Sequence, residues 1–454
     1  MKSVKLLLVG IISAVLLTNY SLAQDQTQTI SSKIDLLLTD AFNKNIFSGI
    51  VTVAQDGKVI YYMPMGYADW QTKRPFTKYT LFNIGSLNKQ FTEEMIHQLV
   101  KENKLIYNDK LSRFLNLYSS EIGDKITIQQ LLDMSAGLGD YLMDPQFRKI
   151  MDTDFTLNEL VNIIKSEPLL FEPGKDTRYS NSGYVILGAV IEKITGKSYE
   201  DNLRERIVLP LGLKNIYYSK SEKENQKDRA FGTMIDFEGN KKSLDDIANS
   251  TPAGGIFSTV EDILNFAEAK RNSKLPSGNK YGLGSYAGGT PLWNCTITFN
   301  EKIGYSYVIM ANVGKIADQI APRIGAIIAN ESYPPLPLPF EMTLYEIINE
   351  KGESYVKNNV KTLAQQADFP YDDRFLNFFG YQFLNADRPD IAVKLFKINT
   401  ELFPAVSNTF DSYAEALVKM GDRENAIKKY KKALSLDPEN TRIKDIIHDL
   451  ETKK

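Results

Sequence analysis

The sequence has few of the residues on which many enzyme sites depend. Among 454 residues there is one cysteine, Cys295, and there are two histidines, His97 and His448. One cysteine excludes an internal disulfide, and this scarcity argues against a zinc site built from cysteine and histidine. A Ser-His-Asp triad would depend on one of two histidines, and a Cys-His pair on Cys295. We therefore expect any hydrolase chemistry to use another side chain as base.

Neither sign of charge is in excess. Lysine and arginine number 54 and aspartate and glutamate 56, which gives a net charge of −2. A chain without a basic surplus lacks the electrostatic footprint of a nucleic-acid partner. With 43% hydrophobic and 24% charged residues, the composition is that of a globular protein, and its length predicts roughly two to three domains.

The first 23 residues have the pattern of a targeting segment. Lys2 and Lys5 precede an apolar run of 12 residues, Leu6 to Leu17, and Ser21-Leu22-Ala23 follows it. This order is typical of a secretory signal peptide, and the run is short for a membrane span of about 20 residues. An uncleaved anchor helix is the alternative. We predict export, periplasmic or secreted, with no stable membrane anchor after cleavage.

Residues 24–333 alternate between strand and helix patterns. Asp-Gly at 56–57, between runs of β-formers, predicts a hairpin over Gly49–Tyr62, and two further strands are expected at 296–299 and 305–310. Capping boxes at Thr127 and at Ser258 with Glu261 predict helix starts, and Gly196 closes a helix over 184–195. Strands at both ends with helices between them predict an α+β fold, with an antiparallel sheet assembled from distant segments.

The composition changes at Tyr333–Pro339, where four prolines predict a stiff linker over 334–340. Beyond it, residues 341–454 repeat at a spacing of 34 residues, with small, small, aromatic and proline positions as in a tetratricopeptide repeat. The matching pairs are Gly380 with Ala414, Ala392 with Ala426, Phe396 with Tyr430, and Pro404 with Pro438. We predict an all-α domain, which either binds a protein partner or packs on the preceding domain.

The candidate chemistry starts at Ser86, which follows a strand-like segment and lies three residues before Lys89. On a helix this spacing puts hydroxyl and amine on one face, and a buried lysine loses its proton more easily and can act as a base. The Ser-x-x-Lys pattern also occurs at Ser277 and Ser354. Only Ser86 lies between a strand pattern and an amphipathic helix, although a helix cap would explain this serine equally well on its own.

A second motif supports the first. Tyr179-Ser180-Asn181 is the only Tyr-x-Asn sequence among 24 tyrosines. A phenol beside a lysine can share or accept the proton of the serine, and an asparagine amide can hold a substrate carbonyl and the lysine. Taken alone, this motif is a turn with a half-buried tyrosine.

Together and in this order, these motifs resemble the class C β-lactamase-like serine hydrolases, a family that includes D-amino-acid peptidases, β-lactamases and esterases. The stretches Ile126–Leu138, Phe171–Pro210 and Pro252–Asp262 are also similar to the family pattern, so the resemblance covers roughly residues 34–330. It implies a β-lactamase/transpeptidase-like antiparallel sheet flanked by helices, and a reaction without metal or cofactor.

The resemblance also implies roles for single residues. Ser86 would be the acylated nucleophile, and either Lys89 or Tyr179 would take its proton. Asn181 would orient a substrate. The family's third motif, a lysine or histidine, a small residue and a glycine on an edge strand, aligns with 285–291. Gly289 would donate its N–H to the oxyanion beside the N–H of Ser86.

The third motif departs from the family at Tyr286, which stands where a cation or imidazole is usual, before Ala287, Gly288 and Gly289. A phenol offers no fixed positive charge to a substrate carboxylate. We therefore expect neutral ester or amide substrates, or a D-amino-acid peptide bond, rather than ordinary β-lactam turnover. The alternative is a weakly active penicillin-binding sensor or scaffold that binds a protein through its repeat tail.

Three other features have simpler interpretations. His97 lies 11 residues after Ser86, about 16 Å along a helix, which is too far for direct catalysis. Cys295 is expected to be a buried strand residue. The charge-rich segment Lys220–Lys242 is expected to be a solvated loop.

Overall fold

The structure is a computed structural model that describes residues 29–118, 120–276 and 283–452. The predicted signal peptide and the Ser277 motif lie outside these residues. The chain divides into two units. The first unit holds residues up to Leu336 without 236–240, and the second holds Asp236–Asn240 and Pro337–Lys454. The boundary between the units falls within the predicted proline-rich linker.

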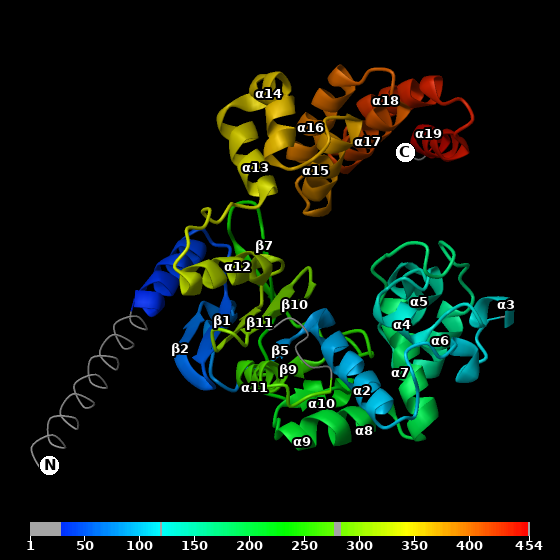
Figure 1. Cartoon of the computed structure of the whole chain (residues 1–454). Helices are drawn as coiled ribbons and strands as arrows, with labels where there is room; N and C mark the ends of the chain where they lie inside the picture. The colour runs from blue at the N-terminus through cyan, green and yellow to red at the C-terminus, as the bar shows by residue number, and fades with distance from the viewer. Residues whose placement is uncertain (1–28, 119, 277–282, 453–454) are drawn as a thin grey trace, which may run out of the picture. The chain divides into compact units, whose positions relative to one another are not determined.

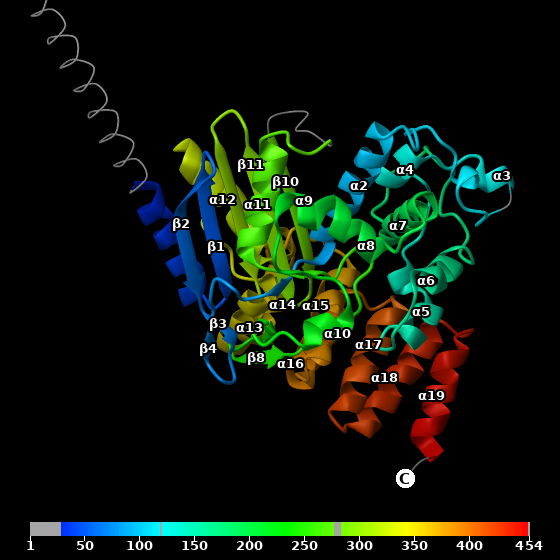
Figure 2. The same ribbon diagram turned by 90° about the horizontal axis from the view of Figure 1, so that it is seen from below.

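An antiparallel sheet of five strands forms the centre of the first unit, in the order β10-β11-β12-β1-β2 (Figures 1 and 2). Its strands come from both ends of the unit because the N-terminal hairpin pairs with the C-terminal strands, as predicted. The strands are β1 (Gly49–Gln55), β2 (Lys58–Met65), β10 (Leu283–Thr290), β11 (Trp293–Asn300) and β12 (Tyr305–Ala311).

The predicted hairpin turn is present at Asp56-Gly57. Both residues have positive φ, 49° and 79°, which matches the twist of the two strands and favours glycine at the second position. The remaining sheets are small. Their strands are β3 (Tyr67–Asp69), β4 (Arg74–Pro75), β5 (Phe82–Asn83), β6 (Ile216–Tyr217), β7 (Gly232–Ile235), β8 (Lys241–Leu244) and β9 (Phe257–Ser258).

Helices cover both faces of the large sheet. On one face, Ile50, Ile297 and Met310 share a core with Phe266 of α11 (Val260–Arg271) and Phe91 of α2 (Lys89–Lys101). On the other face, the Tyr307 hydroxyl donates to the Ala321 carbonyl of α12 (Ile316–Ala329) at 3.1 Å.

Along the sequence, a group of helices falls between the two segments that make the sheet, and Figure 2 shows α3 to α7 of this group to one side of the sheet. The bounds are α3 (Ser120–Gly123), α4 (Ile128–Leu132), α5 (Pro145–Ile150), α6 (Leu157–Ile164), α7 (Asn181–Thr195), α8 (Tyr199–Leu203), α9 (Leu209–Leu211) and α10 (Lys220–Glu224). The predicted caps hold at Thr127, which forms a capping box with Gln130, and at Gly196, whose φ is +70°.

Two local predictions are wrong. A capping box of Ser258 with Glu261 was expected, but the N-cap of α11 is Thr259, whose side chain accepts the N–H of Asp262. The Asp262 carboxylate in turn accepts the N–H of Lys214 at 2.9 Å. The segment Lys220–Lys242 is not a solvated loop: it contains α10 and β7, and its Lys223 is 0% exposed.

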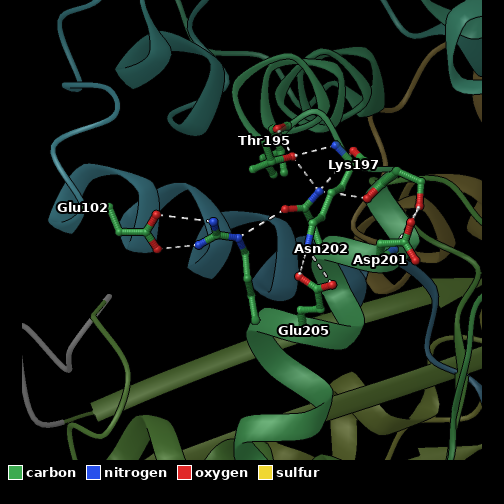
Figure 3. A network of polar contacts seen from close by, with 9 residues as sticks. Glu102, Thr195, Lys197, Asp201, Asn202 and Glu205 are labelled. Atoms are coloured by element: carbon green, nitrogen blue, oxygen red, sulfur yellow. Dashed lines mark hydrogen bonds and ion pairs between the residues drawn. The ribbon is translucent and has the colours of Figure 1, made fainter.

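A polar network joins the C-terminal end of α2 to α8 and to the segment that follows it (Figure 3). The guanidinium of Arg206 donates to Glu102 at 2.6 Å and to the amide oxygen of Asn202 at 3.2 Å. The amide nitrogen of Asn202 in turn donates to the Thr195 hydroxyl at the end of α7. These contacts hold α2 and α7, the two helices that carry the predicted site residues, at their ends away from the site.

The second unit is helical apart from residues 236–240. Its helices are α13 (Phe340–Glu350), α14 (Gly352–Gln366), α15 (Asp373–Asn385), α16 (Pro389–Leu402), α17 (Ser407–Lys419), α18 (Arg423–Leu436) and α19 (Thr441–Thr452). A Cβ on Gly380 would meet the Phe396 ring at 2.4 Å, so a small residue is required there. Assignment to the tetratricopeptide class stays a prediction. Among the described residues, no helix is long and apolar enough to cross a membrane.

Candidate active site

Ser86 lies in a 3₁₀ turn, Gly85–Asn88, directly after β5 and directly before α2. Gly85 has a φ of +52°, and its N–H donates to the side chain of Asn83 at 2.9 Å. A Cβ at Gly85 would stand 2.5 Å from the amide nitrogen of Gly289, so both the conformation and the space require glycine. This turn places Ser86 at the start of the helix, where the sequence predicted it.

Lys89 is the first residue of α2 and is 4% exposed. Its Nζ lies 3.0 Å from Ser86 Oγ, 2.7 Å from Asn181 Oδ1 and 2.7 Å from the Ala253 carbonyl oxygen. The two carbonyl oxygens can accept two N–H groups, and a neutral amine then directs its lone pair at the serine hydroxyl. In this geometry a neutral Lys89 amine can accept the proton of the Ser86 hydroxyl.

Tyr179 also contacts Ser86, and its ring centroid lies 4.9 Å from Lys89 Nζ. Its hydroxyl donates to Ser86 Oγ at 2.6 Å, and its ring is half-exposed. Asn181 begins α7 two residues later, and its amide nitrogen donates to Asp140 Oδ2 at 2.8 Å, which turns its amide oxygen toward Lys89. The structure therefore brings together four predicted residues: Ser86, Lys89, Tyr179 and Asn181.

Burial separates the proton affinities of the two candidate bases. Desolvation lowers the pKa of Lys89 to about 7, although the Asp140 carboxylate opposes this shift. Desolvation raises the pKa of Tyr179, and its hydrogen bond to Ser86 only partly offsets this. Near neutral pH, a large share of Lys89 is a free amine while the phenol keeps its proton.

Backbone from β10 closes the site on the third side. A Cβ on Gly288 would lie 2.2 Å from the Ile84 oxygen, 2.2 Å from the Leu87 nitrogen and 2.8 Å from the Ser86 nitrogen. The strand thus runs against the Gly85–Asn88 turn, and the amide nitrogens of Ser86 and Gly289 lie on two adjoining backbones. Paired N–H groups of this kind stabilise an oxyanion.

Gly288→Ala tests this close approach. The added methyl group has no space, so β10 must move off the Gly85–Asn88 turn and separate the two N–H groups. We expect the rate of Ser86 acylation to fall about 10²-fold, the usual cost of one lost oxyanion donor. Gly183→Ala is the control, because its Cβ would meet only an ordinary contact at 3.5 Å. An unchanged acylation rate in Gly288→Ala would contradict the assignment of the Ser86 and Gly289 N–H groups as oxyanion donors.

Tyr286 lies two residues before Gly288 and therefore faces the same side of the sheet. Its ring is half-buried and lies 6.1 Å from that of Phe299, and Nζ of the buried Lys270 lies 5.2 Å from its centroid. Burial raises the pKa of Tyr286. At this position the chain therefore offers a neutral phenol, with the buried amine of Lys270 behind its ring.

Three groups of the site carried no usable signal in the sequence. The Ala253 carbonyl is a backbone atom, so no residue type marks it. Asp140 lies two residues after a stretch that resembles the family, but a lone acid in a loop has many interpretations. Lys270 is distant in sequence from Tyr286. His97, as expected, is a structural residue whose Nδ1 lies 2.6 Å from the Tyr107 hydroxyl.

Cys295 is buried in β11, as predicted, and its Sγ donates to the Asn83 carbonyl at 3.4 Å. Within residues 29–118, 120–276 and 283–452, no group of three or more histidine, cysteine, aspartate or glutamate side chains could hold a metal ion.

Comparison with known proteins defines the class. Residues 34–317 match the family described as Beta-lactamase, so the chain belongs to this family, and the predicted membership in its serine-hydrolase superfamily is confirmed. Penicillin-binding protein 4* of Bacillus subtilis is 32% identical over 241 residues, which cover 50% of this chain and 52% of that protein. Esterase EstB of Burkholderia gladioli is 27% identical over 211 residues, which cover 43% and 53%. The chain thus spans about half the length of these curated relatives.

Solved structures show the same fold. The octameric penicillin-binding protein homologue from Pyrococcus abyssi aligns with a TM-score of 0.57 and 22% identity, over 70% of this chain and 81% of that chain. The D-amino acid amidase from Ochrobactrum anthropi SV3 also aligns with a TM-score of 0.57 and 22% identity, over 67% and 99%. The β-lactamase/transpeptidase-like fold predicted from the motifs is therefore confirmed.

Proposed function

We propose that this protein is an exported serine hydrolase that acts through an acyl-Ser86 intermediate. The observation that carries the proposal is the position of Ser86 Oγ, 3.0 Å from the Lys89 amine and 2.6 Å from the Tyr179 phenol. A serine is a weak nucleophile until an adjacent base takes its proton. The lowered pKa of Lys89, about 7, makes its amine the base.

The reaction follows from these positions. Lys89 takes the hydroxyl proton as Ser86 Oγ attacks the substrate carbonyl, and the N–H groups of Ser86 and Gly289 receive the developing oxyanion. Tyr179 keeps its proton near neutral pH and donates it to the leaving group, after which the phenolate recovers a proton from Lys89. In deacylation Lys89 takes a proton from water as the water oxygen attacks the acyl carbonyl. The ester bond to Ser86 then breaks, Lys89 returns the proton to Ser86 Oγ, and the acid leaves.

The substrate class is part of the proposal. Neutral Tyr286 favours acyl groups without a carboxylate at this position, such as simple esters and amides, over penicillin-like substrates. The relatives include an esterase and a D-amino acid amidase by name, and both classes of bond fit this mechanism. Asn181 would donate its second amide N–H to a carbonyl oxygen of the substrate, because its first is held by Asp140.

Covalent labelling tests the proposal. The protein is incubated with a fluorophosphonate and, separately, with a penicillin, and intact mass and peptide mapping locate any adduct. We expect a fluorophosphonate adduct on the peptide that carries Ser86 and fast turnover of a p-nitrophenyl ester. A penicillin adduct as well would show that the site also accepts penicillins. A lasting penicillin adduct in a protein that does not turn over the ester would support the sensor alternative. The absence of an adduct with either reagent would reject acylation of Ser86.

Tyr179→Phe tests the phenol separately. The variant keeps the ring and removes the hydroxyl that donates to Ser86, so protonation of the leaving group slows. General acid catalysis typically contributes about 10²–10⁴-fold, and we expect a loss near 10²-fold for a p-nitrophenyl ester, with a larger loss for an amide. Tyr79→Phe, at an exposed tyrosine, is the control. Equal losses for ester and amide would contradict this role.

Export and the helical unit complete the proposal. Residues 1–23 would direct secretion, and residues 341–454 would bind a protein partner through tetratricopeptide-like repeats. Detection of the mature N-terminus at residue 24 in the exported fraction supports the first part.

A further inference from the structure

The segment 248–255 forms a turn against the nucleophile and the first turns of α2. Three successive carbonyls of this turn accept bonds from the nucleophile helix: Thr251 from Asn88 Nδ2 at 2.6 Å, Pro252 from Thr92 Oγ1 at 2.6 Å, and Ala253 from Lys89 Nζ at 2.7 Å. Because two N–H groups of Lys89 are donated to Asn181 Oδ1 and to the Ala253 oxygen, the position of the Ala253 oxygen determines the direction of the lone pair on the neutral amine. The turn thus helps to position the site residues through its backbone carbonyls, without placing a side chain in the site.

Lys223, from α10, contacts the same turn away from α2. Its Nζ donates to the Ala248 carbonyl at 2.6 Å, the Ser250 hydroxyl at 3.0 Å and the Gly255 carbonyl at 3.2 Å. These acceptors lie before and after the bridge that pairs Thr251 with Gly254. An ammonium group has three N–H donors, one for each acceptor, so the charged side chain ties the two ends of the turn together.

We propose that Lys223 is a positioning residue for acylation: by fixing both ends of the turn, it fixes the Ala253 carbonyl that directs Lys89 at Ser86. The inference rests on the proposed function, because it concerns the rate at which Ser86 is acylated. Lys223 does not touch Ser86, Lys89 or the substrate side of the site, and it acts only through the turn.

The charge of Lys223 makes this role depend on pH. The charged groups that face it are Glu200 of α8, Glu224 and Lys220 of its own helix, and Asp246 after β8. The three carboxylates favour the ammonium and Lys220 opposes it, while burial lowers the pKa of Lys223 to about 7. A neutral amine can still donate to the two carbonyls and accept the Ser250 hydroxyl proton, but it loses the charge that makes such hydrogen bonds roughly twice as strong. Deprotonation therefore weakens the hold of Lys223 on both ends of the turn.

The turn has space into which it can relax. A cavity of about 160 Å³ is bounded by Ser250, Thr251 and Pro252 of the turn and by Glu200. Where a core has no such space, close packing holds a segment in place. Here the three hydrogen bonds of Lys223 help to hold the turn, and we expect their loss to move Ala253.

The test compares Lys223→Met with Lys227→Met by the second-order rate of fluorophosphonate labelling at Ser86 from pH 6 to pH 9. Methionine keeps the length of the side chain and removes the donors, and Lys227 is an exposed lysine near the same helix. At pH 6 we expect wild type to react about tenfold faster than Lys223→Met, because misplacement of a catalytic group by fractions of an ångström is costly. By pH 9 the ratio should fall at least threefold, since wild type has then lost the same ammonium. Lys227→Met should match wild type throughout.

A wild-type to Lys223→Met ratio that is large but constant with pH would show a packing role and overturn the proposal, as would a ratio of one at every pH. Absence of Ser86 labelling in wild type would instead reject the proposed function. If Lys223→Met does not fold, Ser250→Ala removes one acceptor and should give a smaller loss. In Ser250→Ala the Lys223 amine still titrates, so the labelling rate should change with pH as in wild type. A constant rate ratio above one between wild type and Ser250→Ala therefore supports the role of Lys223, which acts through its two remaining bonds. Equal labelling rates of the two proteins at every pH would contradict that role.

Discussion

Ser86→Ala is expected to lower the rate of ester hydrolysis by roughly 10⁵–10⁶-fold. The reason is that the two groups beside Ser86 Oγ, Lys89 and Tyr179, have no acyl acceptor once the oxygen is absent, and residues that act as a unit lose nearly everything when one is removed. Residual acceleration would come only from binding and the oxyanion donors. The measurement is steady-state turnover of a p-nitrophenyl ester by protein whose folding is verified by circular dichroism.

Ser354→Ala provides the matched control. Ser354 is the first residue of another Ser-x-x-Lys pattern, but it lies exposed on α14, and Lys357 pairs there with Glu401 at 2.8 Å. We expect this variant to retain full activity. If Ser86→Ala kept turnover and the fluorophosphonate adduct, the nucleophile would be another residue and the mechanism would fail.

The contrast between these two serines shows what could be predicted from sequence. The repeated Ser-x-x-Lys pattern was uninformative by itself, and the neighbouring strand and the Tyr-x-Asn motif selected Ser86. The β1–β2 hairpin and the cap at Thr127 were predictable because local chemistry decides them. The helix start near Ser258 was misplaced by one residue, because Thr259 is the N-cap and Asp262 also accepts the backbone N–H of Lys214 from a distant segment.

The groups that tune the site could not be predicted for a related reason. Lys223 lies in a segment whose composition indicates a solvated loop, yet its amine is buried against three oxygens that come from residues about 30 positions away. Ala253 contributes only a carbonyl. Such contacts depend on how distant segments of the chain meet, and neither the composition nor the periodicity of the sequence predicts that.

Lys89→Met is the second prediction with a large effect. We expect the rate of acylation to fall about 10³–10⁴-fold, because general base catalysis contributes on this scale and the phenol of Tyr179, with its raised pKa, does not replace the amine near neutral pH. In wild type the acylation rate should rise with pH through about 7 as Lys89 loses its proton. In the variant this rise should be absent. Lys101→Met, at an exposed lysine on the same helix, should show wild-type kinetics.

The same lysine should also leave a mark on stability, which separates its role as a base from a loss of folding. Its pKa is about 7 in the folded chain and 10.5 for an unperturbed lysine, so between these values the unfolded chain binds more protons. The free energy of unfolding of wild type must therefore rise with pH across this window relative to Lys89→Met. Urea unfolding of both proteins from pH 6 to pH 10 measures the difference. A constant difference would mean that the pKa of Lys89 is not lowered, and the amine would then be too strongly protonated at neutral pH to serve as the base.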